Sequence, residues 1–229
     1  MPARLRSLTV EIETPRWRGV VLDAVDLTVP AGQITALLGG PGDGKTMTAY
    51  ALTGNLPGSA RMSGEVVVDG AVGYVPQDGI TAFARERTVG AQLREIEAAH
   101  RGRALEEVCA AACYPLEALD LLPGQNSTGQ IQRAALAAAL LTDPDVLVAD
   151  GPTASLDQGT AYALWQTLRA CADAGVACLV ITHDIPLLTA TGYADRVVVM
   201  SGGRVLAAGT LAELASSADP SVRMYLQVL

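Results

Sequence analysis

Short apolar runs alternate with helix-like stretches along most of this chain. The runs predict strands over residues 8–13, 34–38, 66–69, 72–75, 146–150, 178–182, 196–200 and 205–208. Residues 146–149 and 178–181 are apolar at every position, which is typical of strands buried on both faces of a sheet. Because helical patterns lie between the later strands, we expect crossover connections and an α/β fold with a mostly parallel sheet.

Two parts of the chain depart from this alternation. Turn residues at 26–30 and 69–70 indicate that the early strands are antiparallel. Between 78 and 128 the pattern becomes helical, with helices expected over 89–99 and 104–112 and a break at Pro115. We therefore predict a core of residues 1–78 and 129–229, which contains an antiparallel β subdomain, and an inserted helical subdomain of residues 79–128.

A glycine-rich run follows the strand expected at 34–38. It fits G-x-x-x-x-G-K-[ST], a loop whose backbone N–H groups wrap nucleotide phosphates, and consists of Gly39, Gly40, Pro41, Gly42, Asp43, Gly44, Lys45 and Thr46. Lys45, the only lysine of the chain, would neutralise the β- and γ-phosphates, and the Thr46 hydroxyl would bind Mg²⁺. A glycine-rich turn with a chance lysine is disfavoured by the strand before the run and the helix expected over 46–52. The motif predicts ATP or a close relative as ligand.

An aspartate stands where a second buried strand ends. Asp150 closes the apolar run 146–149. At the carboxyl end of a strand beside the phosphate loop, its carboxylate would join the Mg²⁺ shell. Many buried strands end in aspartate, so Asp150 alone is a weak indication of a magnesium site. Together with Lys45 of the phosphate loop it becomes a strong one.

Taken in order, these pieces resemble the ATP-binding subunit of an ATP-binding cassette (ABC) transporter over nearly the whole chain. Residues 73–78 resemble that family's Q-loop, and 126–130 occupy the place of its signature motif. Residues 154–157 resemble the D-loop, and 181–184 resemble the switch-histidine segment. The resemblance implies a P-loop NTPase of ABC type, with residues 1–78 and 129–229 as the ATP-binding core.

The resemblance also implies roles for single residues. Gln77 would sense Mg²⁺ and the attacking water, which makes it a metal ligand together with Thr46 and Asp150, and His183 would reach the γ-phosphate. Trp17 stands where the family places an aromatic ring on adenine, although a lone tryptophan near a strand also serves packing. The remaining nucleotide contacts would cross a head-to-tail dimer and come from Ser127, Gly129, Gln130 and Asp157.

Three positions depart from the family pattern. Gly151 replaces the glutamate that normally follows the strand aspartate and polarises water, and a missing positioned base costs roughly 10²- to 10⁴-fold in rate. In the signature, Asn126 replaces leucine and Thr128 replaces glycine. Asp43 stands in the phosphate loop, where a carboxylate repels a triphosphate unless it points away or forms an ion pair. We expect Mg·ATP binding with very slow hydrolysis, in a degenerate subunit beside an unlike ATPase; an engineered ATP-trapping change at Gly151 is the alternative.

Residues after the phosphate loop indicate a branch of the family. Thr48 and the run Gly54-Asn55-Leu56-Pro57 resemble the peptide/nickel importers. This branch implies a second ATPase, two integral membrane permease subunits and an extracytoplasmic solute-binding protein, with peptide, nickel or metal-chelate cargo. An ABC exporter and a soluble ABC ATPase, such as a cluster-assembly factor, share the motifs and stay open. If the chain were a P-loop kinase or GTPase, its matches to the Q-loop, the signature, the D-loop and the switch-histidine segment would all be coincidences.

Bulk composition narrows the location and the partners. Net charge is −8 with scattered arginines, which argues against nucleic-acid binding. The longest apolar run, 134–141, falls short of the ~18 residues of a membrane span, and the first residues carry no signal-like segment. We expect a cytoplasmic protein held at the inner face of the membrane by permease subunits. The four cysteines lack zinc-site spacing, so buried free thiols are expected.

Overall fold

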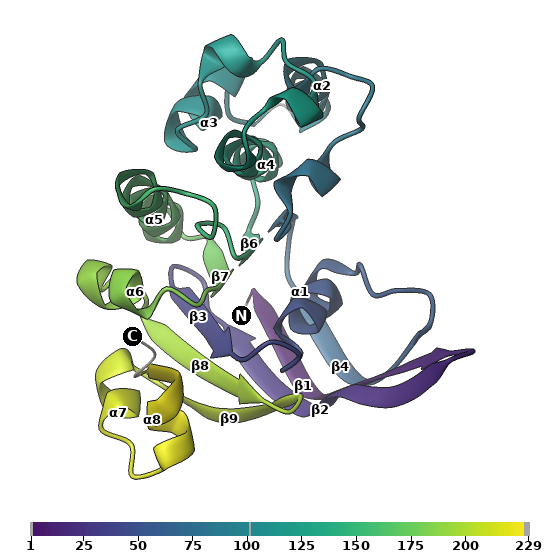
Figure 1. Ribbon diagram of the computed structural model, residues 1–229, viewed down its shortest axis with the longest axis vertical. Helices are drawn as coiled ribbons and strands as arrows, with labels where there is room; N and C mark the ends of the chain where they lie inside the picture. The colour runs from purple at the N-terminus through teal and green to yellow at the C-terminus, as the bar shows by residue number, and fades with distance from the viewer. Residues whose placement is uncertain (1, 101, 227–229) are drawn as a thin grey trace.

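The computed structural model describes residues 2–100 and 102–226, whose strands form two sheets (Figure 1). The smaller sheet has the order β2-β1-β4 and is antiparallel: β1 (Ala3–Thr14), β2 (Trp17–Val29) and β4 (Ala60–Val68). The larger sheet has the order β5-β6-β7-β3-β8-β9: β3 (Ile34–Gly39), β5 (Val72–Val75), β6 (Val146–Asp150), β7 (Ala177–Ile181), β8 (Arg196–Ser201) and β9 (Arg204–Gly209). Its pairs are parallel except for β8 with β9, which confirms the predicted fold class.

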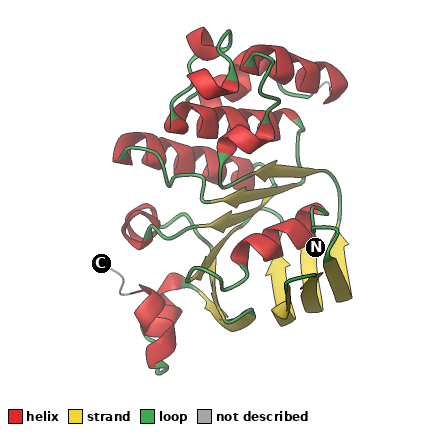
Figure 2. Ribbon diagram, turned by 45° about the vertical axis from the view of Figure 1, so that its right-hand side comes forward, coloured by secondary structure: helices red, strands yellow, loops and turns green. Residues whose placement is uncertain are grey.

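The helices occupy three regions. In the core lie α1 (Lys45–Thr53), α5 (Gln158–Asp173) and α6 (Ile185–Thr191), while α7 (Leu211–Ala215) and α8 (Pro220–Leu226) follow β9. Figure 2 shows the remaining helices gathered at the end of the molecule away from the antiparallel strands: α2 (Val89–His100), α3 (Leu105–Ala111) and α4 (Thr128–Leu141). Short 3₁₀ turns connect them: η1 (Gly79–Ala82), η2 (Leu116–Ala118) and η3 (Pro123–Gln125). The domain division at residues 78 and 129 stays a prediction, since α4 packs on α2 and α3 and also on β5.

Two apolar clusters lie on the two faces of the larger sheet. On one face, Ile34 and Leu38 of β3 pack with residues of α4 and α5. On the other face, Leu37 packs with α1 and with the antiparallel sheet. Consecutive strand residues point to opposite faces, so a strand covered on both sides has to be apolar throughout. This is why β6 and β7, each buried at all five positions, were recognisable as continuous apolar runs.

The early strands are antiparallel as expected, but the sequence prediction failed on their bounds. It missed β2, and the turn expected at 26–30 is wrong because β2 continues to Val29. Left-handed residues interrupt the pairing, with φ of 44° at Ser7 and 49° at Ala24. Side chains satisfy the displaced N–H groups: Ala24 N donates to Thr9 Oγ1 and Ser7 N donates to Asp26 Oδ1. Each bulge inserts a residue and shifts the two-residue alternation that marks a strand.

Trp165 on α5 tests the packing of the core. Its side chain is fully buried, and among the described residues its Nε1–H has no acceptor. We expect Trp165→Ala to lower the free energy of unfolding by about 3–5 kcal/mol, because it opens a cavity. Trp165→Phe should cost clearly less, because it also removes the unsatisfied N–H. Urea unfolding measures both, and equal losses would contradict this account of the site.

Candidate nucleotide site

The phosphate loop joins the end of β3 to the start of α1. Gly44, the residue before the helix, has φ of 91°, and a Cβ there would lie 2.6 Å from Leu22 Cδ2. A Cβ on Gly39 would lie 2.7 Å from the carbonyl oxygen of Met200. Only glycine fits such left-handed and crowded positions, so the loop can curl tightly over the helix N-terminus. Backbone N–H groups at that terminus favour an anion.

Lys45 lies across the mouth of this loop. Its Nζ donates to the carbonyl oxygens of Gly39 at 2.9 Å and Gly40 at 2.7 Å, and its residue is 7% exposed. Burial lowers the pKa of the ammonium, while Asp43 and Asp150 act in the opposite direction. A buried cation that donates to neutral carbonyl oxygens in the described chain is suited to a multiply charged anion.

A hydroxyl and a carboxylate meet beside the lysine. Thr46 Oγ1 donates to Asp150 Oδ2 at 2.7 Å, although the two residues lie on different elements, α1 and β6. Burial raises the pKa of the Asp150 carboxyl, and the Thr46 hydrogen bond and Lys45 oppose the rise. Among the described residues, no three histidine, cysteine, aspartate or glutamate side chains cluster as a metal site. One carboxylate and one hydroxyl fit Mg²⁺, which takes few protein ligands and shares the rest with phosphate and water.

One cavity of about 420 Å³ gathers most of the predicted chemistry. Its lining consists of Val21, Pro41, Gly42, Gly44, Lys45, Thr46, Met47, Gln77, Asp150 and His183. Five chain segments that are far apart in sequence therefore meet here. Four of them follow β3, β5, β6 and β7, which are parallel neighbours, so their carboxyl ends share one edge of the sheet. Sequence reasoning missed Val21 and Met47, which carry no recognisable chemical signal.

Gln77 is held by a residue that sequence reasoning did not single out. Gln132 of α4 is buried, and its amide bridges both flanks of Gln77. It accepts from Gly79 N and donates to the Pro76 carbonyl oxygen, each at 2.9 Å. These two hydrogen bonds tie the segment around Gln77 to α4. The only sequence signal was the position of Gln132, two residues after the signature run.

The other predicted contact residues lie outside this cavity. Trp17 is 53% exposed at the turn between β1 and β2, and it does not line the cavity. Ser127 caps α4: its Oγ accepts from Gln130 N, and Gln130 Oε1 accepts from Ser127 N. Gly129 lies against the D-loop, where a Cβ would come 3.2 Å from Ser155 O. Their roles toward nucleotide stay predictions.

Asp157, the last predicted contact residue, serves as the cap of α5. Its carboxylate accepts from the backbone N and the hydroxyl of Thr160, and these hydrogen bonds lower the Asp157 pKa. Asn126, which stands where the signature normally has leucine, also forms hydrogen bonds with nearby residues. It accepts from the Tyr114 hydroxyl and donates to the Leu122 carbonyl oxygen, both at 3.0 Å. A leucine could make neither bond, so the surroundings of Asn126 match the amide.

Gly151 has a backbone conformation that suits glycine. Its φ is +57°, and the nearest atoms to an added Cβ are Gln77 Cγ at 3.7 Å and Ala154 Cβ at 4.0 Å. Space is therefore available for a side chain, but the left-handed conformation disfavours one. The cavity holds groups suited to phosphate and Mg²⁺, and the position after Asp150 supplies no base.

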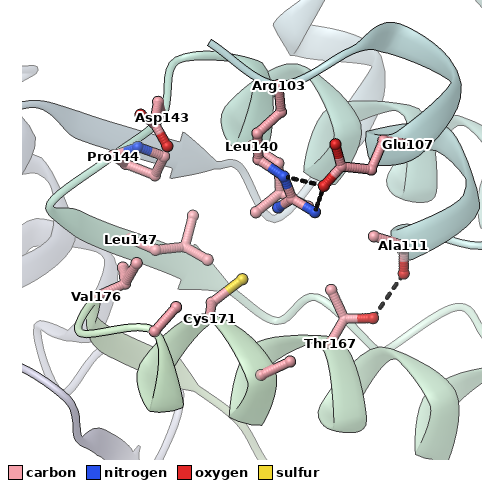
Figure 3. A pocket seen from close by; sticks show the side chains of 12 residues that line it. Arg103, Glu107, Ala111, Leu140, Asp143, Pro144, Leu147, Thr167, Cys171 and Val176 are labelled. Carbon is pink, nitrogen blue, oxygen red and sulfur yellow. Dashed lines mark hydrogen bonds and ion pairs between the residues drawn. The ribbon is translucent and has the colours of Figure 1, made fainter.

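A second cavity, about 370 Å³, lies between α3 and α5 (Figure 3). Arg103 and Glu107 form an ion pair across its mouth at 2.8 Å. Thr167 Oγ1 donates to the Ala111 carbonyl oxygen at 2.6 Å and so ties α5 to α3. The Cys171 thiol faces this space, and burial raises its pKa. None of the predicted site residues lines this cavity.

The cysteines carry no assigned chemistry. All four are free: Cys109, Cys171 and Cys178 are buried as expected, whereas Cys113 is half-buried. Burial raises the pKa of Cys109 to about 11, which keeps that thiol protonated at neutral pH.

Within residues 2–100 and 102–226, no helix combines the length and the apolar character needed to cross a membrane.

Comparison with known proteins places this geometry in a family. Residues 22–154 match the family described as ABC transporter. The oligopeptide transport ATP-binding protein OppD of Mycobacterium tuberculosis is 32% identical over 80% of this chain and 34% of its own length, so the chain spans about a third of that relative. The hypophosphite import ATP-binding protein HtxD of Stutzerimonas stutzeri is 37% identical over 91% of this chain and 67% of its own length.

A solved structure shares the fold. It is a dimeric ATP-binding cassette in a post-hydrolysis state bound to ADP and Pi, with a TM-score of 0.78. The match covers 91% of this chain and 98% of that chain at 23% sequence identity.

Substitutions at Gly151 test the missing base. We expect Gly151→Glu and Gly151→Gln to lose the same stability, about 1–2 kcal/mol, because both residues must adopt the left-handed conformation. Only the glutamate should raise single-turnover ATP hydrolysis, because only a carboxylate can accept a proton from water. Thermal unfolding and quenched-flow hydrolysis measure the two effects. An unchanged rate with Gly151→Glu would show that the missing carboxylate does not limit this site.

His183 should titrate below the ordinary histidine range. Burial lowers its pKa from 6.5, Lys45 adds to this, and Asp150 opposes it. The unfolded chain then binds more protons just below pH 6.5, so the His183 contribution to stability falls as the pH drops toward the folded-state pKa. NMR of the ring C–H protons follows the titration, and His100→Gln identifies the signal because the chain has two histidines. Lys45→Met should raise the His183 pKa, and a midpoint above 6.5 in the unmodified protein would contradict the assignment.

Proposed function

Because this chain belongs to the ABC transporter family as an ATP-binding domain, we propose that it is the catalytically degenerate ATP-binding subunit of an importer. The observation that carries the proposal is the contrast at the end of β6. Asp150 keeps its contact with Thr46, while the next residue is a left-handed glycine. Binding groups are retained and the base is missing.

In such a subunit the chain's own residues bind and orient the nucleotide. The loop from Gly39 to Thr46 holds the phosphates, with Lys45 as the cation. Thr46, Asp150 and Gln77 would hold Mg²⁺, which draws charge from the phosphates when bound. His183, at the same cavity, would donate to the γ-phosphate. ATP then stays bound in this site and serves the closure of two domains more than its own hydrolysis.

A homodimer would lack the glutamate at both sites, so we propose an unlike ATPase as partner. In a head-to-tail dimer this chain's residues 126–130 and Asp157 would complete the partner's site. The exposed position of Ser127 and Thr128 at the N-terminus of α4 supports such a contact. Sustained hydrolysis would then come from the partner's glutamate.

Import is supported by the relatives, and the cargo class by a local match. Both sequence relatives described above carry import or oligopeptide transport in their names. The Thr48 and Gly54–Pro57 signals point to peptide, nickel or metal-chelate cargo, carried with two permease subunits and an extracytoplasmic solute-binding protein. The proposal implies a location at the cytoplasmic face of the membrane. An exporter subunit or a soluble cluster-assembly ATPase remains the alternative.

A groove between the core and the helical region supports membrane-subunit docking. It has a volume of about 520 Å³ and lies where α1 ends, beside the segment that follows Gln77. Tyr50 and Tyr74 line it, with ring centroids 6.1 Å apart in an edge-to-face arrangement. Ala82 and Thr142 also line it. A permease segment seated here would contact both α1 and the flank of Gln77.

Recovery of the complex from native membranes tests this assembly. With a tagged chain, we expect the intact-complex mass to contain a second ATPase and two membrane subunits. Ala82 is exposed, so we expect an Ala82→Arg variant to be recovered without the membrane subunits, because the larger, charged side chain would block their docking. The variant should keep its Mg·ATP affinity, because Ala82 does not line the nucleotide cavity. Recovery as a homodimer, or only with soluble proteins, would contradict the importer proposal.

A further inference from the structure

The C-terminal helix α8 contacts the phosphate loop through one side chain. The Tyr225 hydroxyl donates to Asp43 Oδ2 at 3.0 Å and hydrogen-bonds to Ser201 Oγ at 3.2 Å. Asp43 and Tyr225 lie 182 residues apart in sequence. Tyr225 belongs to none of the motifs named in the sequence analysis, because α8 lies outside all of them.

The Asp43 carboxylate joins three separate parts of the chain. Its Oδ2 also accepts from Gly40 N at 2.5 Å, within the phosphate loop itself. Its Oδ1 accepts from Gly202 N at 2.9 Å, in the turn between β8 and β9. Three donors therefore hold the charge on the side of the loop away from the cavity, whose lining does not include Asp43. This accounts for a carboxylate next to a triphosphate site.

The helix that supplies Tyr225 is docked by other contacts as well. Val222 is buried, so removal of the Tyr225 hydroxyl alone leaves an anchor for α8. Between α8 and the loop lies an apolar cavity of about 410 Å³, lined in part by Pro41, His183 and Met224. Tyr225 also lines this cavity, and its side chain packs against the core cluster. Its hydroxyl group makes the polar contact from α8 to the phosphate loop, through Asp43.

We propose that Asp43 and Tyr225 are positioning residues for nucleotide: α8 holds the phosphate loop in its binding form through the Asp43 carboxylate. Glycines give the loop many alternative conformations, and the three hydrogen bonds remove some of them. Without the Tyr225 donor, the carboxylate keeps its charge but loses part of its restraint. It can then turn toward the phosphates and weaken their binding. The inference rests on the ATP-binding part of the proposed function and does not depend on import or on an unlike partner.

A double-mutant cycle on the full-length chain tests the connection. We expect Tyr225→Phe to weaken Mg·ATP binding about tenfold, as loss of a hydrogen bond to a charged group does. Asp43→Asn removes the charge and replaces one acceptor oxygen with an NH₂ group that would face the backbone N–H of Gly40 or Gly202, so this variant should itself weaken Mg·ATP binding. When Tyr225→Phe is added to the Asp43→Asn variant, the affinity should change less than about twofold. Isothermal titration calorimetry with Mg·ATP measures all four proteins.

Controls separate this role from general destabilisation. Tyr162→Phe removes another tyrosine hydroxyl, one that lies 3.5 Å from the Tyr193 hydroxyl and outside the nucleotide cavity, and it should leave Mg·ATP affinity unchanged. The thermal midpoint of Tyr225→Phe should stay close to that of Tyr162→Phe. Its loss of affinity should shrink at high salt, because screening weakens the freed charge.

Three outcomes would overturn the inference. In the first, Tyr225→Phe binds Mg·ATP as tightly as the wild type. In the second, Tyr225→Phe lowers the affinity of the Asp43→Asn variant as much as it lowers that of the wild type. In the third, Tyr162→Phe loses as much affinity as Tyr225→Phe. Absence of Mg·ATP binding by the wild type would overturn the proposed function too. Normal wild-type binding with an inert Tyr225→Phe overturns only the positioning role.

Discussion

A buried ammonium group has to be surrounded by oxygen atoms, and the organisation of this molecule around Lys45 follows from that requirement. Two loop carbonyls supply the direct contacts, and the carboxylates of Asp43 and Asp150 supply the charge. Asp150 can take part only because β6 is one strand removed from β3 in the sheet order. The larger sheet is thus the element that brings charge of opposite sign from distant sequence positions to one cation.

The division between what the sequence could and could not predict follows the range of the interactions. The phosphate loop, β6 and β7 were predictable because their signals are local: a glycine-lysine spacing and four-residue apolar runs. β2 was missed because a bulge at Ala24 breaks the alternation that marks a strand, and the bulge at Ser7 lies just before residue 8, where the predicted first strand begins. These bulges depend on cross-strand partners, Asp26 and Thr9, which no local pattern discloses.

The same distinction applies within the site. Lys45, Thr46, Gln77, Asp150 and His183 were identified by residue type and order, and the structure brings them to one cavity. The direction of the Asp43 carboxylate was not predictable, because it is set by Gly202 and Tyr225, far along the chain. The left-handed backbone of Gly151 was also unforeseen, since a glycine in sequence does not disclose its φ. Trp17 was assigned by position alone and lies at an exposed turn.

The isolation of Lys45 has a consequence for chemistry applied to the protein from outside. The chain carries a single lysine, whose residue is 7% exposed and whose amine donates to two carbonyl oxygens. Reagents that acylate or cross-link side-chain amines therefore have one side-chain target, and that target lines the nucleotide cavity. Lysine reactivity becomes a single-residue reporter of whether this cavity is occupied, free of the surface lysines that complicate such labelling in ordinary proteins.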